Sequence, residues 1–170
     1  MNSEATNARR FLPPRWRHAL LTAHIAMSVG LLGDSAGFLA VAIRAARTSD
    51  PILRNELVEV LNMFSLVFGI PLSVGALVSG IALGLGTKWG VFRYPWVVAK
   101  LLIIVSVMLV GSFVISPAHA AMLQGREDAA ANLIVAAAYD VVALGVATWL
   151  SVFKPGRAFR STRLTKQETA

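Results

Sequence analysis

The sequence predicts an all-α integral membrane protein, a bundle of four transmembrane helices. Of its 170 residues, 56% are hydrophobic and 15% are charged, whereas an ordinary soluble domain is about a quarter charged. Each of four apolar stretches reaches the roughly 20 residues that a helix needs to cross a bilayer; they lie at about 18–45, 60–86, 95–117 and 130–153. Because backbone groups cannot stay unpaired in lipid, and the alternating segments of a membrane β-barrel are absent, each stretch is expected to be a helix.

The first apolar stretch follows a group of arginines, which resembles the charged start of a signal peptide; they are Arg9, Arg10, Arg15 and Arg17. The apolar run is too long for a signal peptide and holds no clear small-residue cleavage site. We therefore interpret it as an uncleaved first span.

The links between the spans carry helix start and stop signals. Asp50 and Pro51 fit an N-cap followed by the first helical position, and Pro95 opens the third span. Pro117 and Gly125 are expected to bracket the third link. Residues 18–153 thus form a single transmembrane domain, between a basic tail at 1–17 and a second basic tail at 154–170.

The distribution of Lys and Arg predicts the orientation of the spans. Twelve of the 16 lie in or beside the two tails and the second link, and four lie in or beside the other two links. The positive-inside rule then places both termini in the cytoplasm of a plasma-membrane protein, so the net charge of +7 reflects topology and not binding to nucleic acid. Four tryptophans near the cytoplasmic ends fit an interfacial belt: Trp16, Trp89, Trp96 and Trp149.

Small residues predict how the helices pack, because helices in lipid associate through close contacts between small side chains. The second span carries one such stripe, with Pro71 expected to kink it: Ser65, Gly69, Ser73, Ala76, Gly80 and Gly84. The first span adds Gly33 and Gly37. In the fourth span a small face is expected to meet protein (Ala136, Asp140, Ala143, Ala147, Ser151), and a β-branched face to meet lipid (Ile134, Val135, Val141, Val142, Val146).

Two aspartates interrupt these apolar stretches, Asp34 in the first and Asp140 in the fourth. A carboxylate at mid-membrane costs about 2.5–3.5 kcal/mol on insertion scales and normally faces a bundle interior or a water-filled cavity. Counted along the helices, Asp34 lies about 24 Å above His18 and Asp140 about 15 Å below the outer end of its span, so their depths overlap. If the two carboxyl groups approach each other, at least one should carry a proton, because two close carboxylates cannot both ionise cheaply in a low dielectric.

These aspartates leave two interpretations open. The functional one is a proton-carrying or cation-binding site. The alternative is a protonated acid that hydrogen-bonds a serine or a backbone carbonyl of another helix.

The other intramembrane polar candidates are His24 and Lys100. Lys100 lies at the cytoplasmic edge of the third span, where snorkelling of its ammonium group is the simple explanation. His24 shares a face with Ser28 and Ser35 and is expected to hydrogen-bond within the bundle. A haem held by paired histidines is disfavoured, because no two histidines lie on facing helices at one depth.

His119, Met122 and Met108 offer a possible copper site on the external side, since imidazole and thioether ligands suit that metal. Their spread over 15 positions makes the signal weak. The chain has no cysteine, which excludes disulfides, thiolate metal sites and a thiol nucleophile. No phosphate loop, His-Glu-x-x-His or Gly-x-Ser-x-Gly motif occurs, so the sequence predicts no enzyme, although chemistry that uses the two aspartates stays open.

Trp89, Arg93 and Trp96 lie with Lys100 at the predicted cytoplasmic interface. Aromatic and basic side chains at this depth could hold an anionic lipid head group. Ordinary interfacial anchoring is the alternative.

Two segments, "LTAHIAMSVGLLGDSAGFLAV" (21–41) and "LGTKWGVFRYPWVVAKLLI" (85–103), resemble a family of small, uncharacterised four-span membrane proteins of high-GC actinobacteria. The matching positions are His24, Ser28, Val29, Gly30, Leu32 and Gly33, then Gly86, Thr87, Trp89, Gly90, Phe92, Arg93, Trp96, Val97 and Lys100. The resemblance implies a four-span fold and a membrane location, and it assigns no activity. A more distant likeness is to copper-resistance membrane proteins of the CopD type.

We therefore expect a multi-pass membrane protein without a cofactor, most simply a non-enzymatic accessory or structural component. Its expected partners are membrane lipids, and itself or another membrane protein. Two alternatives stay open: a small transporter or proton-linked carrier that uses Asp34 and Asp140, and a haem- or copper-binding membrane protein.

Overall fold

The computed structural model describes residues 13–86, 94–126 and 128–153, and this part of the chain is an all-α bundle. The first helix is α1 (Pro14–Arg47) and the last is α6 (Ala129–Phe153). The second consists of α2 (Pro51–Met63), the π-helical segment η1 (Phe64–Gly69) and α3 (Ile70–Gly86); the third of α4 (Pro95–Val110), the π-helical segment η2 (Gly111–Ile115) and α5 (Ser116–Leu123). All four are long and apolar enough to cross a membrane, which confirms the predicted fold class.

The helix starts follow the capping signals of the sequence. The Asp50 carboxylate accepts hydrogen bonds from the N–H groups of Ile52 at 2.9 Å and Leu53 at 3.4 Å, and Pro51 is the first helical residue. Pro95 likewise opens α4. Both predictions are confirmed, and the second helix begins nine residues before the apolar stretch that suggested it.

Each long helix with an internal proline contains a π-helical turn directly before that proline. The Ile70 N–H bonds to the Ser65 carbonyl, and the Ser116 N–H bonds to the Gly111 carbonyl, both five residues back. A proline has no N–H, and its ring clashes with the carbonyl four residues earlier; a widened turn removes that clash. A widened turn thus precedes Pro71 in the second helix.

Pro117 does not end the third helix, and that prediction was wrong. The η2 turn absorbs the proline, and α5 continues to Leu123. The chain turns only at Gly125, whose φ of +78° lies in the left-handed region that favours glycine. The third link is thus shorter than the sequence suggested.

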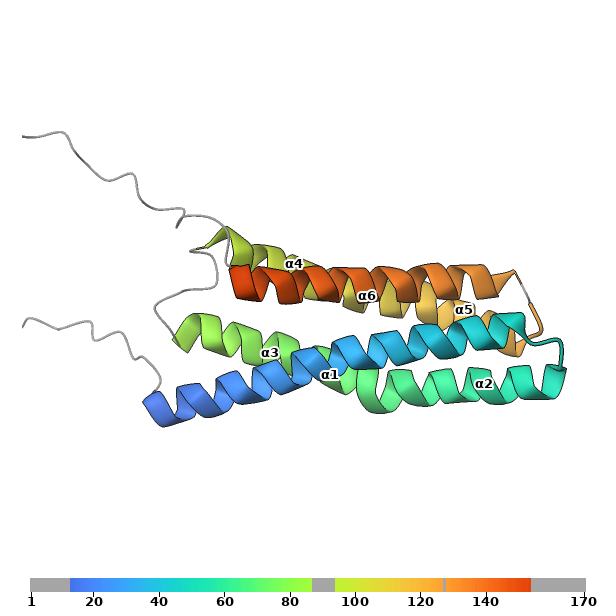
Figure 1. The fold of residues 1–170 in the computed structure, drawn as a ribbon, viewed down its shortest axis with the longest axis horizontal. Coiled ribbons are helices and arrows are strands. Elements are labelled where there is room, and N and C mark those ends of the chain that lie inside the picture. Colours follow the sequence, from blue (N-terminus) through green and yellow to red (C-terminus); the bar gives the residue numbers. More distant parts are fainter. Residues whose placement is uncertain (1–12, 87–93, 127, 154–170) are drawn as a thin grey trace, which may run out of the picture.

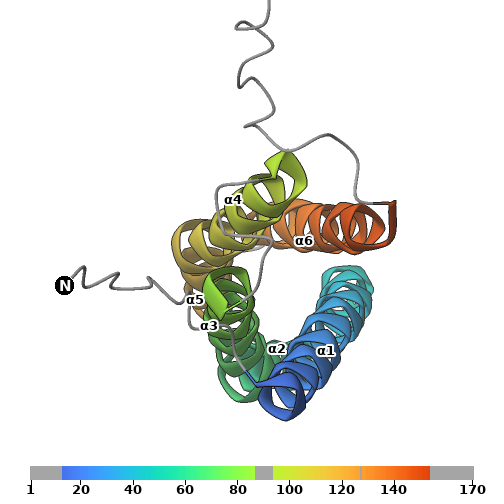
Figure 2. The same ribbon diagram turned by 90° about the vertical axis from the view of Figure 1, so that its left-hand side faces the viewer.

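The bundle has two different ends. The start of α1 and the end of α6 lie at one end, which we name the terminal end, and the links α1–α2 and α5–α6 lie at the other, which we name the far end (Figure 1). Viewed from the terminal end, α1, α3, α4 and α6 stand around a ring (Figure 2). Toward the far end, α2 and α5 take the places of α3 and α4, while α1 and α6 contact each other along the bundle.

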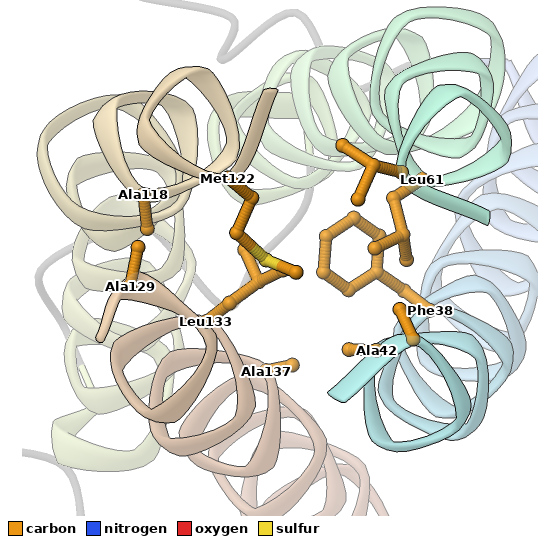
Figure 3. Packing of buried hydrophobic residues seen from close by; sticks show 10 residues of the cluster. Phe38, Ala42, Leu61, Ala118, Met122, Ala129, Leu133 and Ala137 are labelled. Atoms are coloured by element: carbon orange, nitrogen blue, oxygen red, sulfur yellow. The ribbon is translucent and has the colours of Figure 1, made fainter. Parts of the chain in front are cut away.

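Two separate groups of buried apolar side chains hold these helices together. The far core lies among α1, α2, α5 and α6, and its members Phe38, Leu61, Met122 and Leu133 are directed toward one another (Figure 3). Its remaining buried members are Ala42, Ala45, Val58, Ala118, Ala129 and Ala137. The second group, which we name the terminal cluster, has only four buried members: Leu31, Val107, Ala143 and Leu144.

The two faces predicted for α6 are largely as expected. Ala136, Asp140 and Ala143 are buried in the bundle, whereas Val135 and Val142 are exposed on its surface, where lipid would surround them. The small face of this helix thus points Asp140 into the protein.

Candidate functional site

Close packing of α1 against the second helix positions the first aspartate. Five glycines at this contact would each bring an added Cβ to within 4 Å of a side chain of the opposite helix. From the terminal end to the far end the pairs are Gly80 with His24, Gly75 with Met27, Gly30 with Leu72, Gly69 with Asp34, and Gly37 with Phe64. Such contacts are how helices approach one another in a membrane.

Gly33 is not part of this contact, and that prediction was wrong. A Cβ built on Gly33 would meet nothing within 4 Å, whereas one on Gly37 would lie 3.0 Å from a ring carbon of Phe64. The reason is the helical period, since Gly30 and Gly37 share the face toward the second helix and Gly33 points away from it.

Asp34 and Asp140 lie in one layer across the bundle. In α1, Asp34 stands between Leu31 of the terminal cluster and Phe38 of the far core, and in α6 Asp140 stands between members of the same two groups. Because α1 and α6 are antiparallel neighbours (Figure 1), the two aspartates occur at the same level. We name Asp34, Gly69 and Asp140 the carboxyl layer.

The carboxyl oxygens of this layer are incompletely paired. Among the residues that the structure describes, two buried side-chain oxygens lack a hydrogen-bond partner, and they are Oδ1 of Asp34 and Oδ1 of Asp140. Asp140 is only 7% exposed. An unpaired buried polar group lowers the stability of the fold by about 1–3 kcal/mol. Two such groups at one level are therefore destabilising, and close packing of the helices does not require them.

The π-helical segment η1 borders the carboxyl layer. A Cβ on Gly69, the last residue of η1, would lie 3.4 Å from Oδ2 of Asp34. The Gly69 carbonyl accepts a hydrogen bond of 2.5 Å from the Ser73 hydroxyl. Since π-helical turns occur frequently at functional sites, η1 is a second, independent indication that the carboxyl layer is a functional site.

A second polar group lies on the terminal side of the layer and involves three helices. Nδ1 of His24 in α1 is 2.9 Å from the hydroxyl of Ser79 in α3, and the charge of Lys100 in α4 acts on the same imidazole. The Ser79 hydroxyl donates its single proton to the carbonyl of Gly75 at 2.6 Å and therefore accepts from His24. A neutral His24 with its proton on Nδ1 fits this arrangement, and the imidazole also interacts with the backbone of Ala76.

The copper ligands suggested by the sequence do not come together. His119 and Met108 lie on one nearly continuous helix, where 11 residues separate them by about 16 Å. Nε2 of His119 is hydrogen-bonded at 2.8 Å to the Val58 carbonyl, and Met122 is buried in the far core. The three residues therefore do not converge on one point in this structure.

The histidines are also spread apart in the structure. His18 is exposed near the start of α1, His24 lies in the terminal half, and His119 lies in α5 in the far half. Paired-histidine ligation of a haem would need two of them at one level. That geometry does not occur.

Two of the three proposed head-group residues, Trp89 and Arg93, lie outside the described residues. Trp96 is half-buried at the start of α4, with its ring 6.3 Å from that of Tyr94. Trp16 and Trp149 are exposed near the terminal end of the bundle. The head-group site stays a prediction.

A groove of about 340 Å³ lies at the far end, where Arg54, Asn55 and Arg126 are among its lining residues. A side-chain N–H of Arg54 donates to the Thr48 carbonyl at 2.9 Å, and one of Arg126 donates to the Asp128 carboxylate at 2.9 Å. The hydrogen bond from Arg126 holds the pKa of Asp128 below its usual value. Both arginines therefore already have partners within the link region.

Sequence reasoning missed the partners of the polar residues. Ser79 is the acceptor for His24, and Gly75 receives the Met27 side chain, yet neither residue was singled out. The available signal was depth, since a serine and a glycine of the second span lie opposite His24 and Met27 once the two helices are placed antiparallel.

Comparison with known proteins places the chain in a family. Residues 18–155 match the model of a family described as "Predicted integral membrane protein (DUF2269)". Comparisons with curated proteins and with solved structures gave no match. The matched range includes all four helices except the first turn of α1.

Proposed function

The chain belongs to the DUF2269 family of predicted integral membrane proteins, and from that premise we propose that it is a small proton-linked carrier of the membrane. Asp34 and Asp140 are its proton-binding groups. The bundle supplies a low-dielectric interior in which a proton is exchanged on the carboxyl layer.

One observation carries this proposal: both aspartates have an unpartnered, buried carboxyl oxygen at the same level of the bundle. Intramembrane acids that serve packing alone should find a hydroxyl or a carbonyl on a neighbouring helix. A serine hydroxyl lies near the layer, since Ser73 bonds the Gly69 carbonyl. The acids are left without such partners, as expected of groups that exchange a proton.

Infrared spectroscopy on the protein in lipid vesicles tests the proposal directly. The C=O stretching band of a protonated carboxylic acid should titrate with pH, and each of Asp34→Asn and Asp140→Asn should remove part of it. Both variants should also stop proton uptake that a pH-sensitive dye detects in the vesicles, while helix content and melting midpoint stay near those of the parent chain.

The matched control is Asp128→Asn, which removes an exposed aspartate of the α5–α6 link paired with Arg126. This variant should leave the titrating band and proton uptake unchanged. If both layer variants keep the full band and full uptake, the aspartates are structural and the proposal fails.

We also propose that the protein resides in the plasma membrane with both termini in the cytoplasm. The support is the excess of Lys and Arg at the terminal end. Since the chain has no cysteine, single cysteines at His18 and Glu56 can be labelled with an impermeant thiol reagent on intact cells. Labelling of Glu56→Cys alone supports the orientation, and labelling of His18→Cys alone reverses it.

A second candidate function is the accessory or structural role, in which the bundle assembles with itself or with another membrane protein. The observation that favours it is a set of glycines with open space around them, Gly33, Gly111 and Gly145, because small residues let a neighbouring helix approach closely. Disulfide cross-linking of Gly33→Cys in native membranes tests self-assembly. A dimer band from this variant, but not from Leu102→Cys on the exposed face of α4, would support it, and an absent band would count against self-association through α1.

A further inference from the structure

The two halves of the bundle, on either side of the carboxyl layer, differ in their interior side chains and therefore in how well they could conduct a proton. We propose that the layer exchanges protons through the terminal half only, and that the far core is a closed seal. This inference rests on the proposed function, and it names the side from which the site is loaded.

The far half closes the bundle with apolar side chains from four helices. Val58, Leu61 and Leu133 are fully buried, and Phe38 and Met122 fill the space between them (Figure 3). Every buried member of the far core is apolar. A buried water needs two to four polar partners. The polar side chains Thr48 and His119 of this half are already paired, with the Asp50 N–H and the Val58 carbonyl.

The terminal half has few large buried apolar side chains. In α1 no residue before Leu31 is buried, and in α4 Val107 is the only buried residue. The buried residues of α3 are small, namely Ser73, Ala76, Ser79 and Gly84. The helices at this end therefore lack a core of large apolar side chains comparable with the far core.

Polar side chains mark the interior of this half. His24, Ser79 and Lys100 come from three different helices: Nδ1 of His24 lies 2.9 Å from the Ser79 hydroxyl, and the charge of Lys100 acts on the same imidazole. Ser73 lies between Ser79 and the carboxyl layer, one turn from Gly69, and it is buried. Along α1 the distance from His24 to Asp34 is about 15 Å, which a short file of water could cross with Ser73 beside it.

The chemistry of this route balances without any other reactant. A hydronium ion at the terminal end gives its proton to Nε2 of neutral His24, whose Nδ1–H is held by Ser79, and remains as water. The imidazolium releases the Nε2 proton to the next water, which becomes hydronium, and His24 is neutral again. The proton passes along the file in this way, and the last hydronium protonates a carboxylate of the layer and leaves water. The titratable groups facing this route are His24 and Asp34 of α1, Lys100 of α4 and Asp140 of α6, while α3 contributes the hydroxyls of Ser73 and Ser79.

Silver-ion accessibility tests the proposal, because Ag⁺ is small and reacts with thiols that contact water. Ser73→Cys is the probe in the cysteine-free chain, and Ser35→Cys, also buried, is a second probe in case the first does not fold. His18→Cys and Glu56→Cys, exposed at the terminal end and near the far end, report which face of a membrane vesicle the ion has reached. Folding of every variant is checked by its melting midpoint.

The expected result is that Ag⁺ modifies Ser73→Cys faster from the face that modifies His18→Cys than from the face that modifies Glu56→Cys, by at least an order of magnitude. Faster reaction from the far face, equal rates from both faces, or no reaction from either face in a folded probe would overturn the proposal. The carboxyl band measures the proposed function separately. If the band titrates and the ion enters from the far face, only the route is wrong; if no band titrates, the function itself fails.

Discussion

The far half and the terminal half of this bundle are built from the same four helices, yet the side chains in their interiors differ. The far half packs fully buried leucine and valine side chains into one apolar core. The terminal half buries mostly small residues and places His24, Ser79 and Lys100 among its helices. The carboxyl layer lies at the boundary between them.

The difference shows how a small membrane protein can combine stability with an unpaired acid. In lipid, stability comes from close packing and not from the removal of apolar surface from water. A tightly packed half can then hold the helices in register while the other half stays open enough to admit water. Unpaired carboxyl groups are costly, and the contacts of the far core offset that cost.

The largest loss of stability is expected from Leu133→Ala in the far core. Leu133 is fully buried, and truncating a buried leucine costs about 2–5 kcal/mol through lost contacts and the cavity left behind. Leu144→Ala in the terminal cluster should cost less, by roughly 1 kcal/mol or more, because fewer buried side chains surround it. Unfolding in mixed detergent micelles measures both free energies, with the exposed Leu102 changed to Ala as the control.

An equal loss from Leu133→Ala and Leu144→Ala would show that both halves are packed alike. The division between a sealing half and an open half would then be wrong, whatever the protein does.

The next largest effect is expected from an added methyl group at the α1–α3 contact. A Cβ on Gly75 would clash with Sδ of Met27, which would have to shift, so Gly75→Ala should destabilise the fold by about 1–3 kcal/mol through overpacking. Gly33→Ala has open space and should be neutral or stabilising by up to about 1 kcal/mol, since alanine favours helix. Melting midpoints of the two variants should therefore move apart, and equal shifts would contradict the contact.

Removal of the far-end helix cap should have an intermediate effect. Asp50→Ala loses the hydrogen bonds to the first N–H groups of α2 and should cost about 0.5–2 kcal/mol. Asp50→Asn keeps a capping oxygen and serves as the matched control, expected to remain close to the parent chain. A loss as large from Asn as from Ala would assign the effect to charge and not to capping.

Ser79→Ala, in the terminal half, is expected to change the free energy of unfolding by less than the variants above. It deletes the acceptor of His24, and interhelical hydrogen bonds in membranes contribute about 0.6 kcal/mol on average. The free energy of unfolding should thus change little, while proton uptake by vesicles slows because Nδ1 of His24 is no longer held. Ser112→Ala, which removes an exposed hydroxyl of η2, should affect neither, and unchanged uptake in Ser79→Ala would remove His24 from the route.

The smallest effect is expected at the exposed Arg126–Asp128 pair, because surface ion pairs contribute little. Its hydrogen bond lowers the pKa of Asp128, so any stability it adds is present above the unfolded pKa of aspartate and disappears as the pH falls through the folded value. Arg126→Gln should therefore match the parent melting midpoint at low pH and lie at or slightly below it at neutral pH. A lower midpoint for the variant at low pH than at neutral pH, relative to the parent, would contradict this sign.

The sequence by itself determined the parts of the structure that follow from local chemistry. Apolar length predicted four helices, Asp50 with Pro51 and Pro95 predicted helix starts, and the small face of α6 predicted that Asp140 points inward. Capping, helical period and the cost of polar groups in lipid act on neighbouring residues, so they can be inferred without a partner helix.

The tertiary structure alone decided the features that depend on contacts between helices. It carried α5 through Pro117, chose Gly30 and Gly37 over Gly33 at the α1 contact, and separated His119 from Met108. It also left the oxygens of Asp34 and Asp140 unpaired at one level and placed the tight core on one side of them. The physical reason is that packing in a membrane depends on how the surfaces of separate helices fit, and that fit exists only after the helices have assembled.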